Sequence, residues 1–133
     1  MSTIKTNTLT GTTSAGSIVV TGEGGSTTTN LQQGLAKMWV GWQYSSGSIS
    51  MTDSFNVSGT TDTGTGDASF SFSNNLNSNT GASGVVGHNH ATTGNSILDK
   101  DSTSAFANRL FNNSGGAEDA GGTMSMTIHG DLA

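Results

Sequence analysis

Two of the three histidines, His88 and His90, are the residues best suited to metal chemistry because they lie two positions apart. In an extended segment, residues i and i+2 project to the same side, so both imidazoles would face one way. One such pair does not complete a metal site, whereas three copies of the chain around a symmetry axis would surround an axial ion with nitrogen ligands. The alternative interpretation is a pair of solvated loop histidines that bind no metal.

The stretch from Asp62 to Asp67, with the sequence DTGTGD, places oxygen-bearing side chains at a spacing typical of calcium loops. Glycine between aspartates is also what a tight turn requires, because glycine adopts positive φ and aspartate bonds to nearby backbone. Calcium takes about 6–8 oxygen ligands, more than this single loop supplies. The stretch therefore favours a turn, with a calcium site as the alternative.

Catalytic motifs are absent from the sequence. It contains no G-x-S-x-G elbow, no P-loop and no complete G-x-G-x-x-G, and its serines, histidines and aspartates form no local triad. Because there is no cysteine, disulfides and cysteine-based zinc sites are excluded. We therefore expect a protein that is not an enzyme and that needs no cofactor.

The charge pattern argues against nucleic acid and membranes as partners. Nucleic-acid-binding domains carry a basic patch, whereas this chain has a net charge of −5, a pI near 4.7 and four scattered cations, Lys5, Lys37, Lys100 and Arg109. The sequence does not open with a charged segment followed by a long apolar run. We therefore expect neither a secretion signal nor membrane insertion.

The elements that position these residues centre on the stretch 31–77, which holds both tryptophans, the only tyrosine and three of the five phenylalanines. Half-buried antiparallel strands show alternating apolar and polar residues. That alternation is present in Ser48–Met51, Ala68–Ser73 and Thr123–His129, and Lys37–Tyr44 before them is also interpreted as a strand. Closely spaced strands of this kind predict an all-β fold, an antiparallel β-sandwich over residues 26–133.

One short helix is predicted at about residues 29–36, at the start of the sandwich domain. Thr29 and Gln32 have the spacing of a capping box. Three apolar residues then fall on one helical face, namely Leu31, Leu35 and Met38. The leucines either lie on the chain's own sheet or meet those of other copies at a symmetry axis.

Residues 1–25 are expected to form an extended N-terminal arm. Ile18, Val19 and Val20 indicate a short strand, which needs a neighbouring strand to pair with. The arm either docks on a neighbouring subunit or is a disordered leader. Leu, Ile, Val and Phe make up only roughly 17% of the chain, a thin supply of core residues for offsetting the ordering entropy of so polar a chain. We therefore expect an oligomer, namely a homotrimer.

Residues 74–122 are interpreted as long surface loops, where binding residues commonly sit. Within them, Val85–Val86, Ile97–Leu98 and Phe106–Phe111 are each expected to add either a short strand or an anchor for a loop. Gly59–Gly66 is expected to be a turn. The segment from Phe106 to Phe111 is the one aromatic-flanked part of these loops that could stack on a sugar. The residues that we expect to face a receptor are Asn89, Asn95, Phe106, Asn108 and Asn112.

Two motifs, DSFNVSG at residues 53–59 and DTGTGD at 62–67, carry a family resemblance. Together with GLAKMWV before them and TIHGDLA at residues 127–133, they resemble a module common in virion structural proteins of marine tailed bacteriophages, generally described as tail-fibre-like. The resemblance covers about Thr3 to Leu76 and the last strand, and the chain departs from the module at Asn79–Ala82. It implies a non-enzymatic, multicopy, trimeric virion part, and it brings no catalytic residue.

The resemblance and the polar loops lead to three functional expectations. The first is a virion surface protein of tail-fibre type, assembled in the host cytoplasm, that contributes to host attachment by binding a cell-surface glycan. The second is a capsid decoration protein, which clamps neighbouring shell subunits and needs no receptor. The third is the subunit of an extracellular filament joined by exchange of the N-terminal strand. The expected partners are further copies of the chain and other virion proteins.

Overall fold

The chain consists of two compact units, Met1–Leu35 and Ala36–Ala133. The computed structural model describes residues 3–12, 18–22, 24–45, 47–89, 93–119 and 121–133. The N-terminal arm is predicted to end at residue 25, whereas the first unit extends to Leu35. The reason is that residues 28–30 pair back on residues 19–21 and keep the following helical turn with them.

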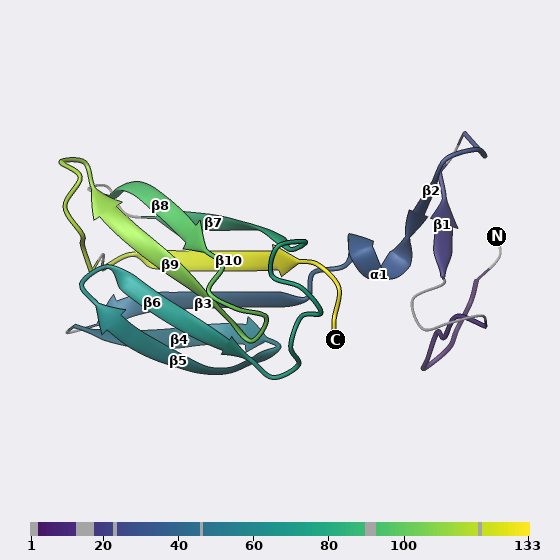
Figure 1. Cartoon of the computed structure of the whole chain (residues 1–133), viewed down its shortest axis with the longest axis horizontal. Helices are drawn as coiled ribbons and strands as arrows, with labels where there is room; N and C mark the ends of the chain where they lie inside the picture. Colours follow the sequence, from purple (N-terminus) through teal and green to yellow (C-terminus); the bar gives the residue numbers. More distant parts are fainter. Residues whose placement is uncertain (1–2, 13–17, 23, 46, 90–92, 120) are drawn as a thin grey trace. The chain divides into compact units, whose positions relative to one another are not determined.

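The first unit is a small hairpin followed by a single helical turn (Figure 1). Strand β1 (Val19–Thr21) pairs antiparallel with β2 (Thr28–Asn30), and α1 (Leu31–Gly34) follows directly. The Leu31 amide donates a hydrogen bond to the Ile18 carbonyl at 2.9 Å, which closes the hairpin. The helix is shorter than the predicted 29–36 because its first residues are taken by the β-ladder.

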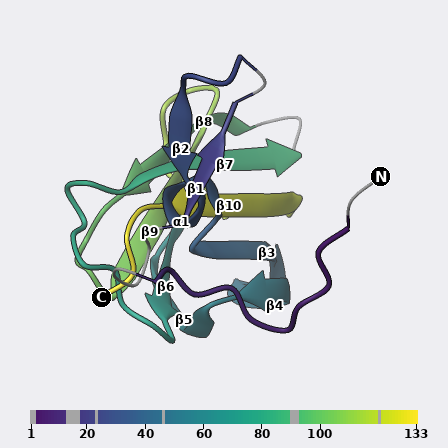
Figure 2. The ribbon, with the colours of Figure 1, turned by 90° about the vertical axis from the view of Figure 1, so that its right-hand side faces the viewer.

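The second unit is a sandwich of two four-stranded antiparallel sheets, as the sequence predicts. Sheet I has the order β4-β3-β10-β7, and sheet II has the order β5-β6-β9-β8. In Figure 2, β7, β10, β3 and β4 of sheet I lie one above another, with the strands of sheet II beside them. The strands are β3 (Met38–Ser45), β4 (Ser48–Phe55), β5 (Val57–Gly64), β6 (Asp67–Phe72), β7 (Ser83–Asn89), β8 (Thr93–Asp99), β9 (Ala105–Asn112) and β10 (Thr123–His129).

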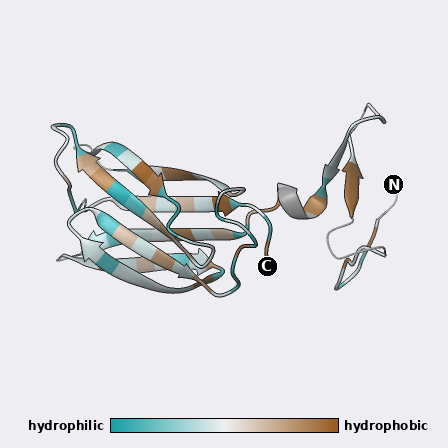
Figure 3. Ribbon diagram, viewed as in Figure 1, coloured by the Kyte–Doolittle hydropathy of each residue, from teal (hydrophilic) through white to brown (hydrophobic). Residues whose placement is uncertain are grey.

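The core lies between the two sheets and is built from alternate residues of their strands. Apolar and polar colours alternate along these strands in Figure 3, as expected where each strand buries one face. Trp42 of sheet I packs on Phe70 of sheet II with ring centroids 4.7 Å apart. Around this contact the buried side chains include Met38, Val40, Phe106, Met124, Met126 and Ile128.

Strand β3 separates the two tryptophans onto opposite faces of sheet I. Trp42 is fully buried, while the side of the sheet away from the core carries Trp39, which is 38% exposed. The register between β3 and β4 shifts between Gly41 and Trp42, which is a β-bulge. A side chain at Gly41 would come within 2.8 Å of the Thr52 hydroxyl, so glycine is the residue that fits there.

Two predicted loop regions are strands in the structure. The expected turn at Gly59–Gly66 is mostly strand β5, and the chain reverses only at Thr65 and Gly66. The region 74–122, expected to be surface loops, contains β7, β8 and β9. Many residues of these segments are poor strand formers, but β5 and β9 pair with β6, β7 pairs with β10 and β8 pairs with β9. This pairing supplies the backbone hydrogen bonds that hold the segments extended.

The two tryptophans give a direct test of where the core lies. Trp42→Ala is expected to lower the free energy of unfolding by about 3–5 kcal/mol, because it removes the largest buried side chain. Trp39→Ala, three residues away, is the matched control and should cost less than half as much. Urea denaturation followed by circular dichroism measures both values, and equal losses would contradict the assignment of Trp42 to the core.

Candidate functional site

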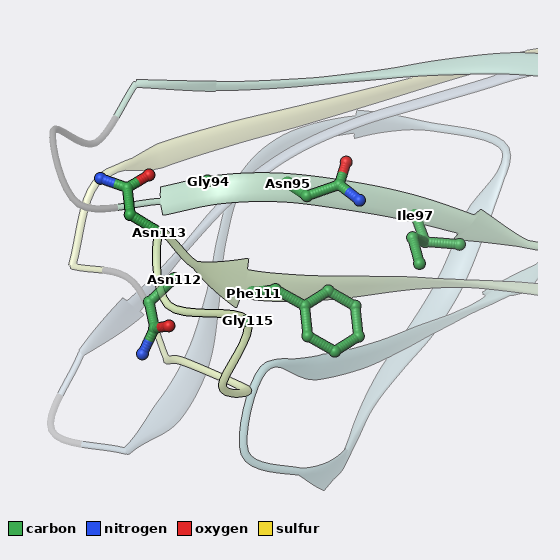
Figure 4. A pocket seen from close by; sticks show the side chains of 7 residues that line it. All are labelled: Gly94, Asn95, Ile97, Phe111, Asn112, Asn113 and Gly115. Atoms are coloured by element: carbon green, nitrogen blue, oxygen red, sulfur yellow. The ribbon is translucent and has the colours of Figure 1, made fainter.

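A groove runs over the end of sheet II where β8 and β9 meet the loop after β9 (Figure 4). Its larger hollow has a volume of about 530 Å³ and a smaller hollow has about 200 Å³. The larger hollow is lined by Gly94, Asn95, Ile97, Phe111, Asn112, Asn113 and Gly115. The smaller one is lined by Thr65, Gly66, Asp67, Arg109, Leu110, Phe111 and Ala117. Phe111 therefore lies between the two hollows and belongs to both.

Strand register explains why these side chains meet. In the pairing of β8 with β9, Asn95 lies opposite Phe111 and Ile97 lies opposite Arg109. Residues two apart on a strand share a face, so Arg109 and Phe111 both lie on the outer face of sheet II. The result is a half-buried aromatic ring beside an exposed isoleucine and an exposed amide side chain.

Phe106 and Asn108 do not face a receptor, contrary to the sequence-based prediction. Both lie on β9 with the opposite parity to Phe111, and both are fully buried between the sheets. Asn108 donates from Nδ2 to the Ser96 hydroxyl at 2.9 Å and to the Ile97 carbonyl at 3.1 Å. Its amide therefore holds β8 to β9 from the inside.

The remaining predicted receptor-facing asparagines take three different places. Asn95 and Asn112 both line the larger hollow. Asn112 shapes the loop after β9, because its Oδ1 accepts hydrogen bonds from the amides of Ser114 at 3.0 Å and Gly116 at 2.9 Å. Asn89 is exposed at the end of β7 in sheet I and does not line the groove.

The smaller hollow is electrostatically acidic despite the presence of an arginine. Arg109 Nε lies 3.5 Å from one carboxylate oxygen of Asp67, and its Nη2 lies 3.2 Å from one of Asp99. Partial desolvation, together with the negative charges of Asp99 and Asp67, raises the pKa of Asp101. Asp119 accepts a hydrogen bond from the Gly66 amide at 2.6 Å and adds a further carboxylate nearby.

Tyr44, inside the sandwich, lies close enough to several carboxylates for their negative charges to act on its hydroxyl. Its hydroxyl is buried without a hydrogen-bond partner. Burial raises the pKa of Tyr44 well above its usual value, and the negative charges of Asp119, Asp62 and Asp67 raise it further. Carboxylates from the β5–β6 hairpin and from the loop before β10 therefore lie near this end of the sandwich.

The stretch from Asp62 to Asp67 forms the tight turn that its composition favours. Asp62 accepts a hydrogen bond from the Gly64 amide at 3.1 Å, and Asp67 pairs with Arg109. Gly66 has a φ of 73°. Within the described ranges, no three or more histidines, aspartates and glutamates lie close enough together to hold a metal ion. His88 is exposed on β7, and His90 lies outside the described residues.

The predicted oligomer contacts lie in the first unit, and several are exposed there. Val19 is 55% exposed and Val20 is 51% exposed, and Leu35 is exposed as well. Ile18 and Leu31 are half-buried. The backbone partner of β1 is β2 of the same chain, so docking of this strand on another subunit stays a prediction.

Sheet I carries a second exposed surface on its outer face. Strand register places Trp39 beside Phe55 on one side and beside Thr127 on the other, and Thr127 lies beside Val85. Phe55 and Val85 are more than half exposed. We call this set, Phe55, Trp39, Thr127 and Val85, the sheet I row.

The chain matches no known family model, no curated protein and no solved structure. Within the described ranges, no helix is long and apolar enough to cross a membrane. The groove therefore has to be interpreted from its own side chains.

Gly66 offers a test of how tightly the smaller hollow is built. A Cβ at Gly66 would come within 2.6 Å of the Leu110 carbonyl and 2.8 Å of the Glu118 amide nitrogen. Gly47 has nearly the same φ, 74°, with no atom within 4 Å of its Cβ position. Gly66→Ala is expected to cost about 1–3 kcal/mol more than Gly47→Ala, because only the first adds a clash with backbone. Thermal denaturation of both variants checks this, and equal shifts in Tm would show that the 110–118 backbone does not press on Gly66.

Proposed function

We propose that this chain is a non-enzymatic surface protein of a phage virion, of tail-fibre type, whose sandwich binds a host cell-surface glycan. The observation that supports this most directly is the half-buried ring of Phe111 between two hollows on the outer face of sheet II. The groove brings together the side-chain types that recognise sugars. The resemblance in the sequence supports the virion location.

The chemistry of the groove suits a hydroxyl-rich ligand. One face of a sugar ring presents C–H groups, which pack well on an aromatic or aliphatic side chain such as Phe111 or Ile97. The amides of Asn95 and Asn113 line the same hollow and can both donate and accept hydrogen bonds. Binding sites commonly combine an apolar floor with a few polar groups in this way.

Assembly into an oligomer, namely a homotrimer with other virion proteins as partners, is the second part of the proposal. The first unit exposes Val19, Val20 and Leu35, and it packs as a unit separate from the sandwich. Exposed apolar side chains concentrated on a small unit are typical of a protein-binding surface. We place the subunit contact there because the first unit buries few of its own apolar side chains.

Capsid decoration is the alternative, and the sheet I row favours it. A flat sheet face with Trp39, Phe55 and Val85 exposed would suit packing on a shell subunit. A decoration protein would need no glycan at the groove. A filament joined by strand exchange has less support, because β1 already has a partner in its own chain.

Phe111→Ala is expected to weaken glycan binding by about tenfold or more, equivalent to about 1.4 kcal/mol, because it removes the ring shared by both hollows. Phe55→Ala is the matched control, since it removes an exposed phenylalanine from the opposite sheet. The ligands come from an array of cell-surface oligosaccharides, and calorimetry gives the affinity per site. Equal affinities for the two variants would rule out the groove as the binding site.

Val19→Ser combined with Val20→Ser is expected to shift the protein from oligomer to monomer at micromolar concentration, without lowering the Tm of the sandwich. Both valines lie in the first unit, so the core between sheets I and II is unchanged. Sedimentation velocity measures the mass. Val85→Ser is the control, because Val85 is similarly exposed on sheet I. Dissociation by Val85→Ser alone would place the contact on sheet I and contradict this assignment.

A further inference from the structure

The charged side chains around the smaller hollow determine which glycans the groove can bind. Arg109 is the only cation lining the smaller hollow, and arginine is the usual residue for binding a carboxylate or sulfate. Here its guanidinium already lies between Asp67 and Asp99. Two carboxylates and one guanidinium leave a local formal charge of −1.

Further carboxylates add negative charge near Arg109 and Gly66. Asp101 lies close enough to Asp99 and Asp67 for their charges to raise its pKa. Asp119 bonds to the Gly66 amide, and Gly66 lines the smaller hollow. None of the three other cations, Lys5, Lys37 and Lys100, is among the residues that line either hollow. A negative field of this kind lowers the local concentration of anions and raises the free energy of binding them.

Among the described residues that line the larger hollow, none carries a charged side chain. Its lining consists of glycines, asparagines, one isoleucine and Phe111. These side chains suit C–H faces and hydroxyls. The two hollows lie on either side of one ring, so a ligand that covers Phe111 reaches the carboxylates around Arg109.

We propose that the groove binds neutral oligosaccharides that span Phe111 and excludes sugars bearing carboxylate or sulfate. This inference rests on the proposed glycan-binding function and names its ligand class. Asp67 and Asp99 hold Arg109 and thereby set the specificity. A sugar anion that approaches Arg109 meets a guanidinium already paired with two carboxylates, and the net local charge it meets is negative.

The experiment compares neutral oligosaccharides with counterparts that differ only by a carboxylate or sulfate, on an array and then by calorimetry. The wild-type chain is expected to bind the neutral member of a pair about tenfold or more tightly than the charged one. Raising the salt concentration should narrow this difference, because salt screens the repulsion.

A double variant, Asp67→Asn with Asp99→Asn, frees Arg109 and changes the local formal charge from −1 to +1. It is expected to gain binding to the charged oligosaccharides, so that the ratio of charged to neutral affinity rises by about tenfold or more relative to the wild-type chain. Asp53→Asn with Asp131→Asn is the control, because it makes the same change in net charge at residues that do not line the groove. Circular dichroism checks that both variants are folded.

The outcomes separate this inference from the proposed function. Equal or tighter binding of the charged oligosaccharides by the wild-type chain would overturn the inference and leave glycan binding intact. A folded double variant that gains no binding to charged sugars, or a control that gains as much, would also overturn it. The comparison of neutral and charged sugars on the wild-type chain decides the question even if the double variant does not fold. Absence of binding to any oligosaccharide would overturn the proposed function together with this inference.

Discussion

The contact between Trp42 and Phe70 is the interaction on which the rest of the sandwich depends. Their ring centroids lie 4.7 Å apart, and each ring comes from a different sheet. Only 31% of the residues are hydrophobic, so much of the burial that offsets chain entropy comes from a few large side chains. With the two sheets fixed by this contact, the outer face of sheet II can carry polar and charged residues that would not stabilise a core.

The strands that could be predicted from sequence are those with large residues at every second position. Phe70 and Phe72 alternate with serines, and Met124, Met126 and Ile128 alternate with small polar residues. Strand β7 could not be predicted in this way, because its glycines are typical of loops. Gly84 in fact satisfies a packing requirement, since a Cβ there would come within 2.5 Å of Ile128 Cδ1. The glycine marks a close approach between chain segments that only the fold makes visible.

Of the residues expected to face a receptor, Asn95 and Asn112 line the larger hollow, and their contact with a receptor stays a prediction. Phe106 is expected on the same face, but an odd separation of five along a strand puts it on the opposite face from Phe111. The arrangement of Arg109 between two aspartates could not be predicted, because it depends on how β9 aligns with β6 and with β8. No local sequence signal encodes that alignment.

The order of strands in sheet I has a consequence for how the protein is made. β10 is the last strand in chain order, yet it lies in the middle of the sheet between β3 and β7. During synthesis, β3 emerges from the ribosome long before β10 does, and until then one edge of β3 lacks its native partner. Contacts of such long sequence separation form slowly and leave apolar surface exposed meanwhile. Completion of sheet I therefore has to wait until β10 has been synthesised, so a chain cut short before β10 would lack the central strand that joins β3 to β7.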